Sequence, residues 1–136
     1  MSETFKWCQD KTRLKIFGKQ VMFVNLFETK YWYLNGQLHR ANGPAVEYIN
    51  GDKWWFLNGE RHRENGPAVE YDDGSKFWHR YGKLHRENGP AIEFADGDRF
   101  WYLDGELHRE NGPAIEFADG TKECIVTGKQ IGRAHV

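Results

Sequence analysis

The stretch Phe77–Arg99 reads FWHRYGKLHRENGPAIEFADGDR, and the stretch that follows it, Phe100–Lys122, reads FWYLDGELHRENGPAIEFADGTK. Two earlier segments of the same length carry the same pattern of letters. Four repeats of 23 residues therefore follow one another without a gap, with the bounds 31–53, 54–76, 77–99 and 100–122. A fixed period of this length is typical of arrays in which each unit packs against its neighbours.

The composition of the repeats excludes helices and favours short strands. Each repeat carries three glycines and one proline, and each such residue costs a helix interior about 1–3 kcal/mol. Asn-Gly and Asp-Gly pairs tolerate the positive φ angles of tight hairpins, and they occur at 35–36, 50–51, 58–59, 73–74, 96–97, 104–105 and 119–120. We therefore expect two strands in each repeat. One is of the KFWYL type, and the other is of the PAIEF type, in which Val or Ile and Tyr or Phe face the core.

These units predict an all-β fold, an elongated single-sheet array of β-hairpin repeats that pair edge to edge. Two strands a repeat at a spacing of ~4.8 Å give a rise of ~10 Å for each repeat. The flanking segments 1–30 and 123–136 are expected to form N- and C-terminal capping half-repeats, because terminal repeats of such arrays close an exposed edge. We expect the whole chain to be one domain.

The repeat resembles the MORN repeat, a unit of similar length. The likeness covers residues 31–122 and rests on Asn-Gly, the Leu-His-Arg that follows it, and Ala-Asp-Gly after Ile-Glu-Phe. The chain departs from the MORN pattern at Arg-Glu-Asn-Gly-Pro-Ala, where MORN units place glycines closely after the histidine. The variant WYLNGxLHRxxGPAxE is similar to repeats of bacterial and bacteriophage proteins. This resemblance implies a curved sheet of hairpins with a scaffold or binding role, towards proteins or lipids.

Charge and hydropathy argue against several classes of protein. The formal net charge is −1 over 136 residues, so no overall field draws the chain to nucleic acid or to an anionic membrane. No run approaches the ~20 apolar residues of a membrane helix. The polar N-terminus also lacks the apolar core of a signal peptide, which predicts a cytoplasmic protein. Cys8 and Cys124 fall near opposite ends of the predicted array, too far apart for a disulfide.

No pattern in the sequence predicts catalysis, a cofactor or a metal. The glycines separate strands and do not begin a helix, so they form no phosphate-binding loop. Zinc ligands must converge to about 2.0–2.3 Å from one ion, whereas histidines of a ladder lie ~10 Å apart. We instead expect each repeated histidine to donate a hydrogen bond that holds its own Leu-His-Arg-Glu-Asn-Gly-Pro loop: His39, His62, His85 and His108.

Arginine and glutamate also recur once in every repeat. Their equal numbers favour cross-strand ion pairs worth about 0–1 kcal/mol each. The alternative is an anion-binding stripe, which is opposed by the glutamates that directly follow three of the arginines. The two rows are Arg40, Arg63, Arg86 and Arg109, and Glu47, Glu70, Glu93 and Glu116.

A row of tryptophans, each preceded by another aromatic residue, leaves three interpretations open. Because neighbours in a strand point to opposite faces, both faces of this strand are aromatic. One face must be core, and the other is either covered by the Leu-His-Arg loop or exposed. If exposed, it suits a protein partner or stacked bases. The tryptophans are Trp32, Trp55, Trp78 and Trp101.

Residues private to one repeat are the candidates for function. Arg80 stands where the other repeats have leucine, Arg61 replaces leucine at another position, and Tyr81 replaces the Asn or Asp of a turn. An unpaired arginine is costly to bury, so both arginines should reach solvent or a partner. We predict a binding patch in the middle of the array, with drift at a tolerant edge as the alternative: Arg61, His79, Arg80, Tyr81, Trp55 and Trp78.

The sequence thus predicts a non-enzymatic protein-binding repeat module. It would be a bacterial or bacteriophage adaptor or inhibitor that occupies a partner protein's surface. The alternative is a nucleotide or single-stranded nucleic-acid binder that uses an aromatic and arginine trough. We expect no cofactor, no membrane span, and either a monomer or a homodimer paired through sheet edges.

Overall fold

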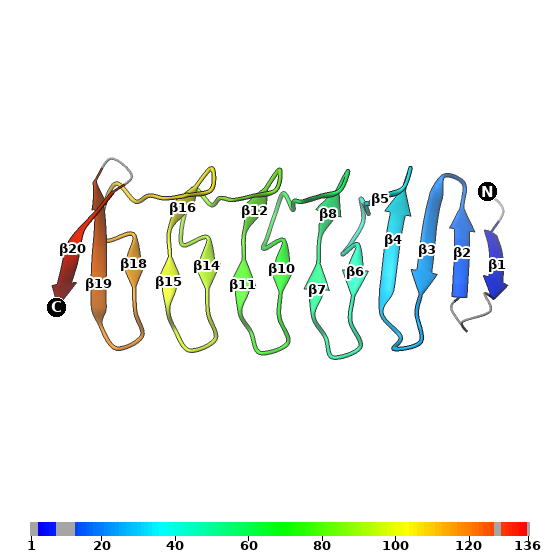
Figure 1. Ribbon diagram of the computed structural model, residues 1–136, viewed down its shortest axis with the longest axis horizontal. Helices are drawn as coiled ribbons and strands as arrows, with labels where there is room; N and C mark the ends of the chain where they lie inside the picture. The colour runs from blue at the N-terminus through cyan, green and yellow to red at the C-terminus, as the bar shows by residue number, and fades with distance from the viewer. Residues whose placement is uncertain (1–2, 8–12, 127–128, 136) are drawn as a thin grey trace.

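Strands lie side by side in one long row, which confirms the predicted all-β array of hairpins (Figure 1). The computed structural model describes residues 3–7, 13–126 and 129–135, and these residues contain no helix. Thirteen strands of the main sheet follow the order β1-β2-β3-β4-β6-β7-β10-β11-β14-β15-β18-β19-β20, and β5 pairs with β4 at its side. The strand pairings of the described residues are antiparallel, as hairpins require.

The N-terminal segment forms a meander of full-length strands ahead of the first repeat. It comprises β1 (Glu3–Trp7), β2 (Arg13–Phe17) and β3 (Gln20–Val24). Strand β3 pairs along its whole length with β4 (Lys30–Leu34), which belongs largely to repeat 1. The Gln20 amide also donates to the backbone carbonyl of His39 at 2.6 Å, which ties this segment to the first loop of the array.

Each repeat contributes two short strands to the main sheet, as predicted. The glutamate of the first strand pairs with the residue before the aromatic position of the second, for example Glu70 with Lys76. The strands are β6 (Val46–Glu47), β7 (Lys53–Trp54), β10 (Val69–Glu70), β11 (Lys76–Phe77), β14 (Ile92–Glu93), β15 (Arg99–Phe100), β18 (Ile115–Glu116) and β19 (Thr121–Val126).

The predicted KFWYL strand is not continuous in repeats 2 to 4, because the chain divides at tryptophan into the main sheet and a separate hairpin. The Trp78 N–H donates to the Ala91 carbonyl in the main sheet at 2.7 Å, whereas its carbonyl accepts from the His85 N–H in the hairpin at 3.0 Å. One residue thus belongs to both ladders. The extra strands are β5 (Gln37–Leu38) in repeat 1, and β8 (Phe56–Leu57), β9 (Glu60–Arg61), β12 (His79–Arg80), β13 (Lys83–Leu84), β16 (Tyr102–Leu103) and β17 (Glu106–Leu107).

Two kinds of turn close the hairpins. The upper turns lie at the top of Figure 1, as between β8 and β9. They have positive φ at both central residues, for example 50° at Asn58 and 82° at Gly59, as a type I′ turn requires. The lower turns lie at the bottom of Figure 1, as between β10 and β11. In these turns only the glycine has positive φ, for example 97° at Gly74, whose N–H donates to the Tyr71 carbonyl at 3.0 Å. The Asn-Gly and Asp-Gly pairs therefore predict turns of both sets, but the two sets have different geometry.

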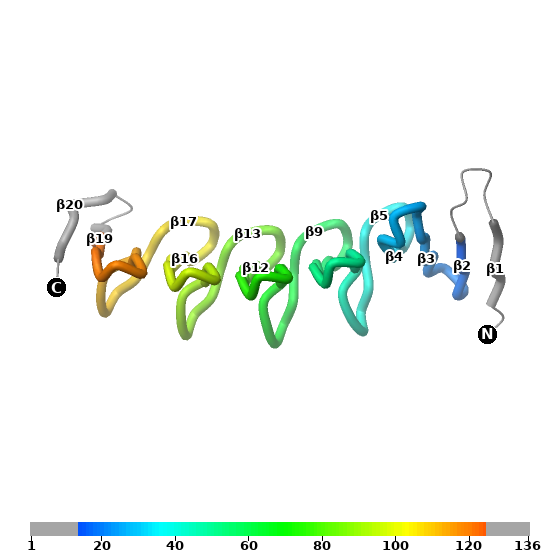
Figure 2. The backbone as a smooth tube through the Cα atoms, turned by 90° about the horizontal axis from the view of Figure 1, so that it is seen from below, coloured from blue at the N-terminus to red at the C-terminus, as the bar shows by residue number. Residues whose placement is uncertain are grey.

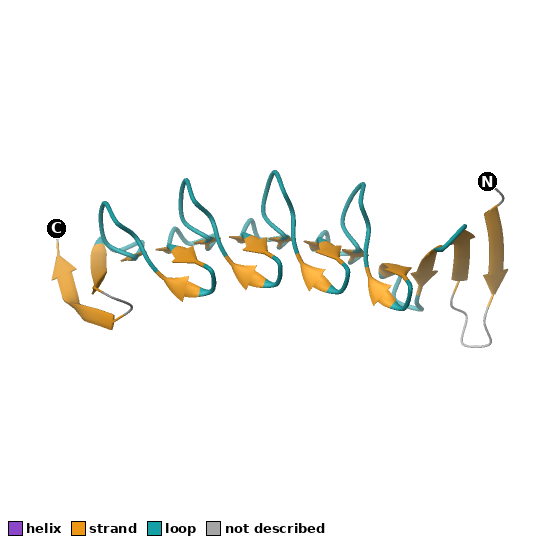
Figure 3. Cartoon of the chain, turned by 90° about the horizontal axis from the view of Figure 1, so that it is seen from above, coloured by secondary structure: helices purple, strands orange, loops and turns teal. Residues whose placement is uncertain are grey.

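The main sheet has two distinct faces, which we call the loop face and the open face. Seen along the strands of the main sheet, the loops that follow β9, β13 and β17 project to one side of the sheet. Strands β9, β13 and β17 themselves lie on the opposite side (Figures 2 and 3). The loop face carries the four repeated tryptophans. Trp55, Trp78 and Trp101 border clefts between the loops, and Arg40 of the first loop covers Trp32. The open face carries the residues that alternate with them along each strand, such as Trp54, Phe77 and Ile92.

Aromatic rings cover the open face and bury the aliphatic row beneath them. Phe77 meets Phe94 edge-to-face at 5.6 Å, and Phe94 meets Phe100 at 5.8 Å. The prediction for the PAIEF strand is wrong in two respects: alanine is fully buried beside the aliphatic residue, and the terminal aromatic residue is 38% exposed at Phe94. Alanine is buried because the tryptophan and loop residues cover its side of the sheet, while no second layer formed by the described residues covers the terminal aromatic residues.

The sheet ends at β1 and β20 (Lys129–His135), the strands through which an edge-paired homodimer would form. Strand β19 is continuous through Cys124, which occupies the position of the repeated tryptophan, and a register shift separates Cys124 from Ile125. Cys8 lies outside the described residues, so the expected separation of the two cysteines stays a prediction.

Candidate binding site

Arginine covers each repeated tryptophan on the loop face. The Arg86 guanidinium carbon lies 3.8 Å from the centre of the Trp78 ring. Arg86 Nη1 also donates to the Pro90 carbonyl at 3.0 Å and to Glu93 at 3.1 Å. The other repeats form the same arrangement, which confirms the predicted arginine–glutamate pairs: Arg40 with Glu47, Arg63 with Glu70, and Arg109 with Glu116.

Three equivalent clefts lie between successive loops of the loop face. The central cleft has a volume of about 560 Å³ and is bordered by residues 62–67, 78–80 and 85–88. Its neighbours are bordered by Trp55 with Leu57 and by Trp101 with Leu103. The central cleft differs because Arg80 stands at the position of these leucines.

Histidine links each loop to the upper turn of the next repeat. His39 Nδ1 accepts from the Asn58 N–H at 2.9 Å, and His62 Nδ1 accepts from the Tyr81 N–H at 3.0 Å. With Nδ1 accepting, the neutral ring carries its proton on Nε2, and His62 Nε2 donates to Glu64 at 2.9 Å. The prediction that each histidine donates within its own loop is therefore incomplete, because its main partner lies one repeat further on.

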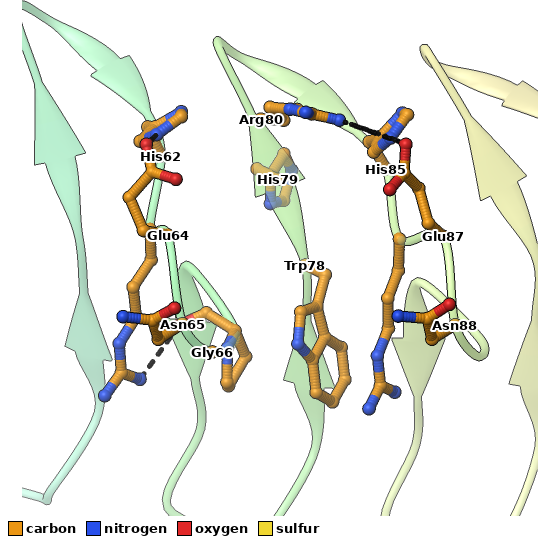
Figure 4. A pocket seen from close by; sticks show the side chains of 13 residues that line it. His62, Glu64, Asn65, Gly66, Trp78, His79, Arg80, His85, Glu87 and Asn88 are labelled. Atoms are coloured by element: carbon orange, nitrogen blue, oxygen red, sulfur yellow. Dashed lines mark hydrogen bonds and ion pairs between the residues drawn. The ribbon is translucent and has the colours of Figure 1, made fainter.

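Arg80 disturbs this arrangement in repeat 3. Its Nη1 atom lies 2.9 Å from His85 Nε2 and 3.6 Å from Glu87 (Figure 4). His85 Nδ1 faces the Asp104 N–H at 3.0 Å. A neutral imidazole has one N–H, so both of its nitrogens cannot accept at once. Arg80 and the Asp104 N–H therefore compete for one ring, and no such competition arises where leucine occupies the position.

Tyr81 occupies a turn position that favours Asn, Asp or Gly. Its φ angle is 49°, which is costly for a residue with a large side chain. Its ring lies 4.3 Å from the ring of His62, and 62% of the residue is exposed. Tyr81 is thus a large apolar side chain presented to solvent at the rim of the array.

Arg61 and His79 lie together on the open face. The Arg61 guanidinium carbon is 5.3 Å from the centre of the Trp54 ring, and its backbone carbonyl accepts from the Gly82 N–H at 2.9 Å. His79 is buried, with 9% of its surface exposed. Burial, and then the nearby Arg61 charge, lower the pKa of His79 to about 4, against a smaller opposite effect of the Phe77 carbonyl.

The predicted patch is therefore divided between two faces. Trp55, Trp78 and Arg80 border the clefts of the loop face. Arg61 lies with Trp54 on the open face, and His79 lies near Arg61 but also borders the central cleft. Arg80 reaches solvent as expected, with 49% of its side chain exposed. Arg61 is half-buried and lies near Trp54, a residue that the prediction missed. Aligning the four repeats and comparing the residues that share one face of the sheet would have identified Trp54.

The described residues include no group of three or more His, Cys, Asp and Glu side chains placed to hold a metal ion. Within the same residues, no helix has the length and hydropathy needed to cross a membrane. No model of a known protein family matches the chain, and no curated protein matches it.

Proposed function

We propose that this chain is a protein-binding repeat module without chemistry of its own, an adaptor or inhibitor of bacterial or bacteriophage type. The observation that carries the proposal is the position of the residues that break the repeat. Arg61, His79, Arg80 and Tyr81 lie on strands β9 and β12 and the turn after β12, which adjoin at the middle of the array (Figure 2).

The surface around these residues suits a protein partner. Exposed and half-exposed aromatic side chains lie next to arginine, the combination that dominates the energetics of protein interfaces. Tyr71 and Phe94, on the main sheet nearby, are 37% and 38% exposed. A regular sheet holds these side chains in fixed positions, so little ordering entropy is lost on binding.

A nucleotide or single-stranded nucleic acid is the alternative ligand. Stacked bases need an accessible ring face, and an arginine already covers one face of each repeated tryptophan at 3.7–3.8 Å. Those arginines are also held by glutamate. A base would have to enter from the cleft side, so this alternative has weaker support than a protein partner.

Affinity capture from a lysate of the source organism tests the proposal. The tagged chain is compared with the Arg61→Leu/Arg80→Leu double variant, which restores the leucines of the other repeats, and captured proteins are purified and titrated by calorimetry. We expect a protein that binds the wild-type chain and loses about ten-fold or more in affinity for the variant.

Two results would contradict the proposal. A captured protein that binds both chains equally would remove the central residues from the interface. An eluate without a specific protein, but with absorbance near 260 nm and binding that falls steeply as salt rises, would favour the nucleic-acid alternative.

A further inference from the structure

At one place on the open face, three residues with side-chain nitrogens stand where other repeats have leucine, tyrosine or phenylalanine. Arg61 takes the position of Leu84 in the next repeat, and His79 takes that of Phe56 in the repeat before it. Trp54 stands where the other repeats have tyrosine or phenylalanine: Tyr31, Phe77 and Phe100. Each change adds a side-chain nitrogen, and Arg61 lies close to both of the other residues.

These three residues supply all the buried side-chain nitrogen and oxygen atoms that lack a hydrogen-bond partner among the residues that the structure describes: Trp54 Nε1, Arg61 Nε and His79 Nδ1. A buried polar atom without a partner is unfavourable, because it loses its hydrogen bond to water and gains none in return. Other repeats avoid this cost with leucine and aromatic residues. We propose that Trp54, Arg61 and His79 form a binding site for a carboxylate, supplied by an Asp or Glu side chain in an acidic segment of the partner protein.

The chemistry of the three residues favours a carboxylate. The Trp54 indole and the Arg61 guanidinium only donate hydrogen bonds, so the ligand must supply acceptors. No carboxylate of the described residues forms an ion pair with Arg61, in contrast to the paired arginines of the loop face. One guanidinium balances one carboxylate, and its Nε and Nη groups bind both oxygens side by side. A phosphate dianion would need further cations.

The position of the site suits a protein segment. Trp54 and Arg61 are half-buried on the open face, opposite the side to which the long loops project (Figure 3). Half-exposed aromatic residues continue along this face on both sides, at Tyr48 and Tyr71. A peptide laid along the array could thus place its apolar side chains on this row while one acidic side chain reaches Arg61.

This inference rests on the proposed function, and a titration with a defined peptide tests it separately. The probe is a ten-residue oligo-glutamate peptide added to the isotope-labelled full chain, and the observable is the indole N–H resonance of Trp54, assigned with Trp54→Phe. We expect a saturable downfield shift, because the indole gains an acceptor. An oligo-glutamine peptide should give no saturable shift.

The repeats offer a matched control that keeps composition and net charge. The double variant Arg61→Leu/Leu107→Arg moves the arginine to the equivalent position of repeat 4, where its strand partner is Tyr102. We expect this variant to bind the peptide at least about ten-fold more weakly. Equal binding by both chains would show non-specific attraction and overturn the site, as would the absence of any shift at Trp54.

Two further titrations, with inorganic phosphate and with free acetate, test which anion the site prefers. Acetate should shift the same resonance weakly, whereas an equal or tighter response to phosphate would overturn the assignment to a carboxylate. The proposed function fails separately, when the wild-type chain captures no protein. If a captured protein binds the moved-arginine variant as tightly as the wild type, the protein-binding function stands and the carboxylate site fails.

Discussion

His62 and Tyr81 are 19 residues apart, yet the His62 imidazole accepts a hydrogen bond from the Tyr81 backbone N–H at 3.0 Å and packs against the Tyr81 ring. His62 is almost fully buried, with 3% of its surface exposed. The equivalent bond joins His39 to Asn58, and the Asp104 N–H faces His85 in the same way, in competition with Arg80. Histidine therefore fastens each repeat to the next at the upper turns of the array.

Replacing His62 with alanine should open one of these fastenings. The Tyr81 N–H loses its acceptor, and we expect the free energy of unfolding to fall by about 1–3 kcal/mol. Hydrogen exchange at the Tyr81 amide should accelerate, while the Asn58 and Asp104 amides, which keep their histidines, should exchange as before. Equal acceleration at all three amides would contradict a local role.

Replacing Tyr81 with asparagine should stabilise the fold. Asparagine already occupies the same turn position at Asn35 and Asn58, with φ angles of 51° and 50°. A bulky residue at positive φ costs about 1–3 kcal/mol, and the contact between the Tyr81 and His62 rings offsets part of this cost. We therefore expect the free energy of unfolding, measured by urea denaturation, to rise by about 1 kcal/mol. Tyr81→Phe keeps the strain and should leave stability unchanged. A destabilised Tyr81→Asn would mean that the ring contact outweighs the strain.

Replacing Arg86 with lysine should destabilise the loop face. Lysine cannot lie flat on Trp78 and cannot bridge the Pro90 carbonyl and Glu93 with one planar group. We expect a loss of about 1–2 kcal/mol in thermal or urea unfolding. The control is Arg99→Lys, at an exposed strand position, which should change stability by less than about 0.5 kcal/mol. Similar losses for both variants would argue against stacking.

The lowered pKa of His79 makes stability depend on pH. The folded-state pKa is about 4, below the ordinary value of 6.5, so between these values the unfolded chain binds the proton and the folded chain does not. Stability contributed by the neutral ring is therefore complete above about pH 6.5 and is lost as pH falls towards 4.

The variant His79→Phe removes this dependence and copies the residue of repeat 2. Between pH 7.5 and pH 4.5, we expect the wild type to lose about 2 kcal/mol more than the variant, as the difference between two denaturation series. Carboxylates also titrate in this range, but they contribute to both chains and cancel. Parallel pH profiles would show that His79 titrates normally in the folded state.

The repeat by itself predicted the elements and their order. The 23-residue period, the Asn-Gly and Asp-Gly pairs and the excess of glycine and proline lead to short antiparallel strands, because these signals act through the φ and ψ preferences of single residues. The arginine–glutamate pairs were predictable for a related reason. Arg86 and Glu93 each recur in every repeat, so an ion pair that forms in one repeat is expected in all four.

The binding residues were predicted only in part. Residues that break the pattern are visible in the sequence, and Arg61, His79, Arg80 and Tyr81 were found in this way. Their grouping was not visible, because Arg61 and His79 fall on the open face and Arg80 on the loop face. Trp54 was missed because an aromatic residue in an aromatic column breaks no pattern until its indole nitrogen is found buried without a partner.

Only the tertiary structure decided how the repeats join. The strand divides at tryptophan, histidine bonds to a turn 19 residues away, and the Asp98 side chain accepts from the Ala118 N–H, 20 residues away. Local preferences do not specify such contacts, since each needs its partner to have been placed already by the neighbouring repeat. The sequence determined the unit, and the packing of one unit on the next determined the faces and clefts that a partner would meet.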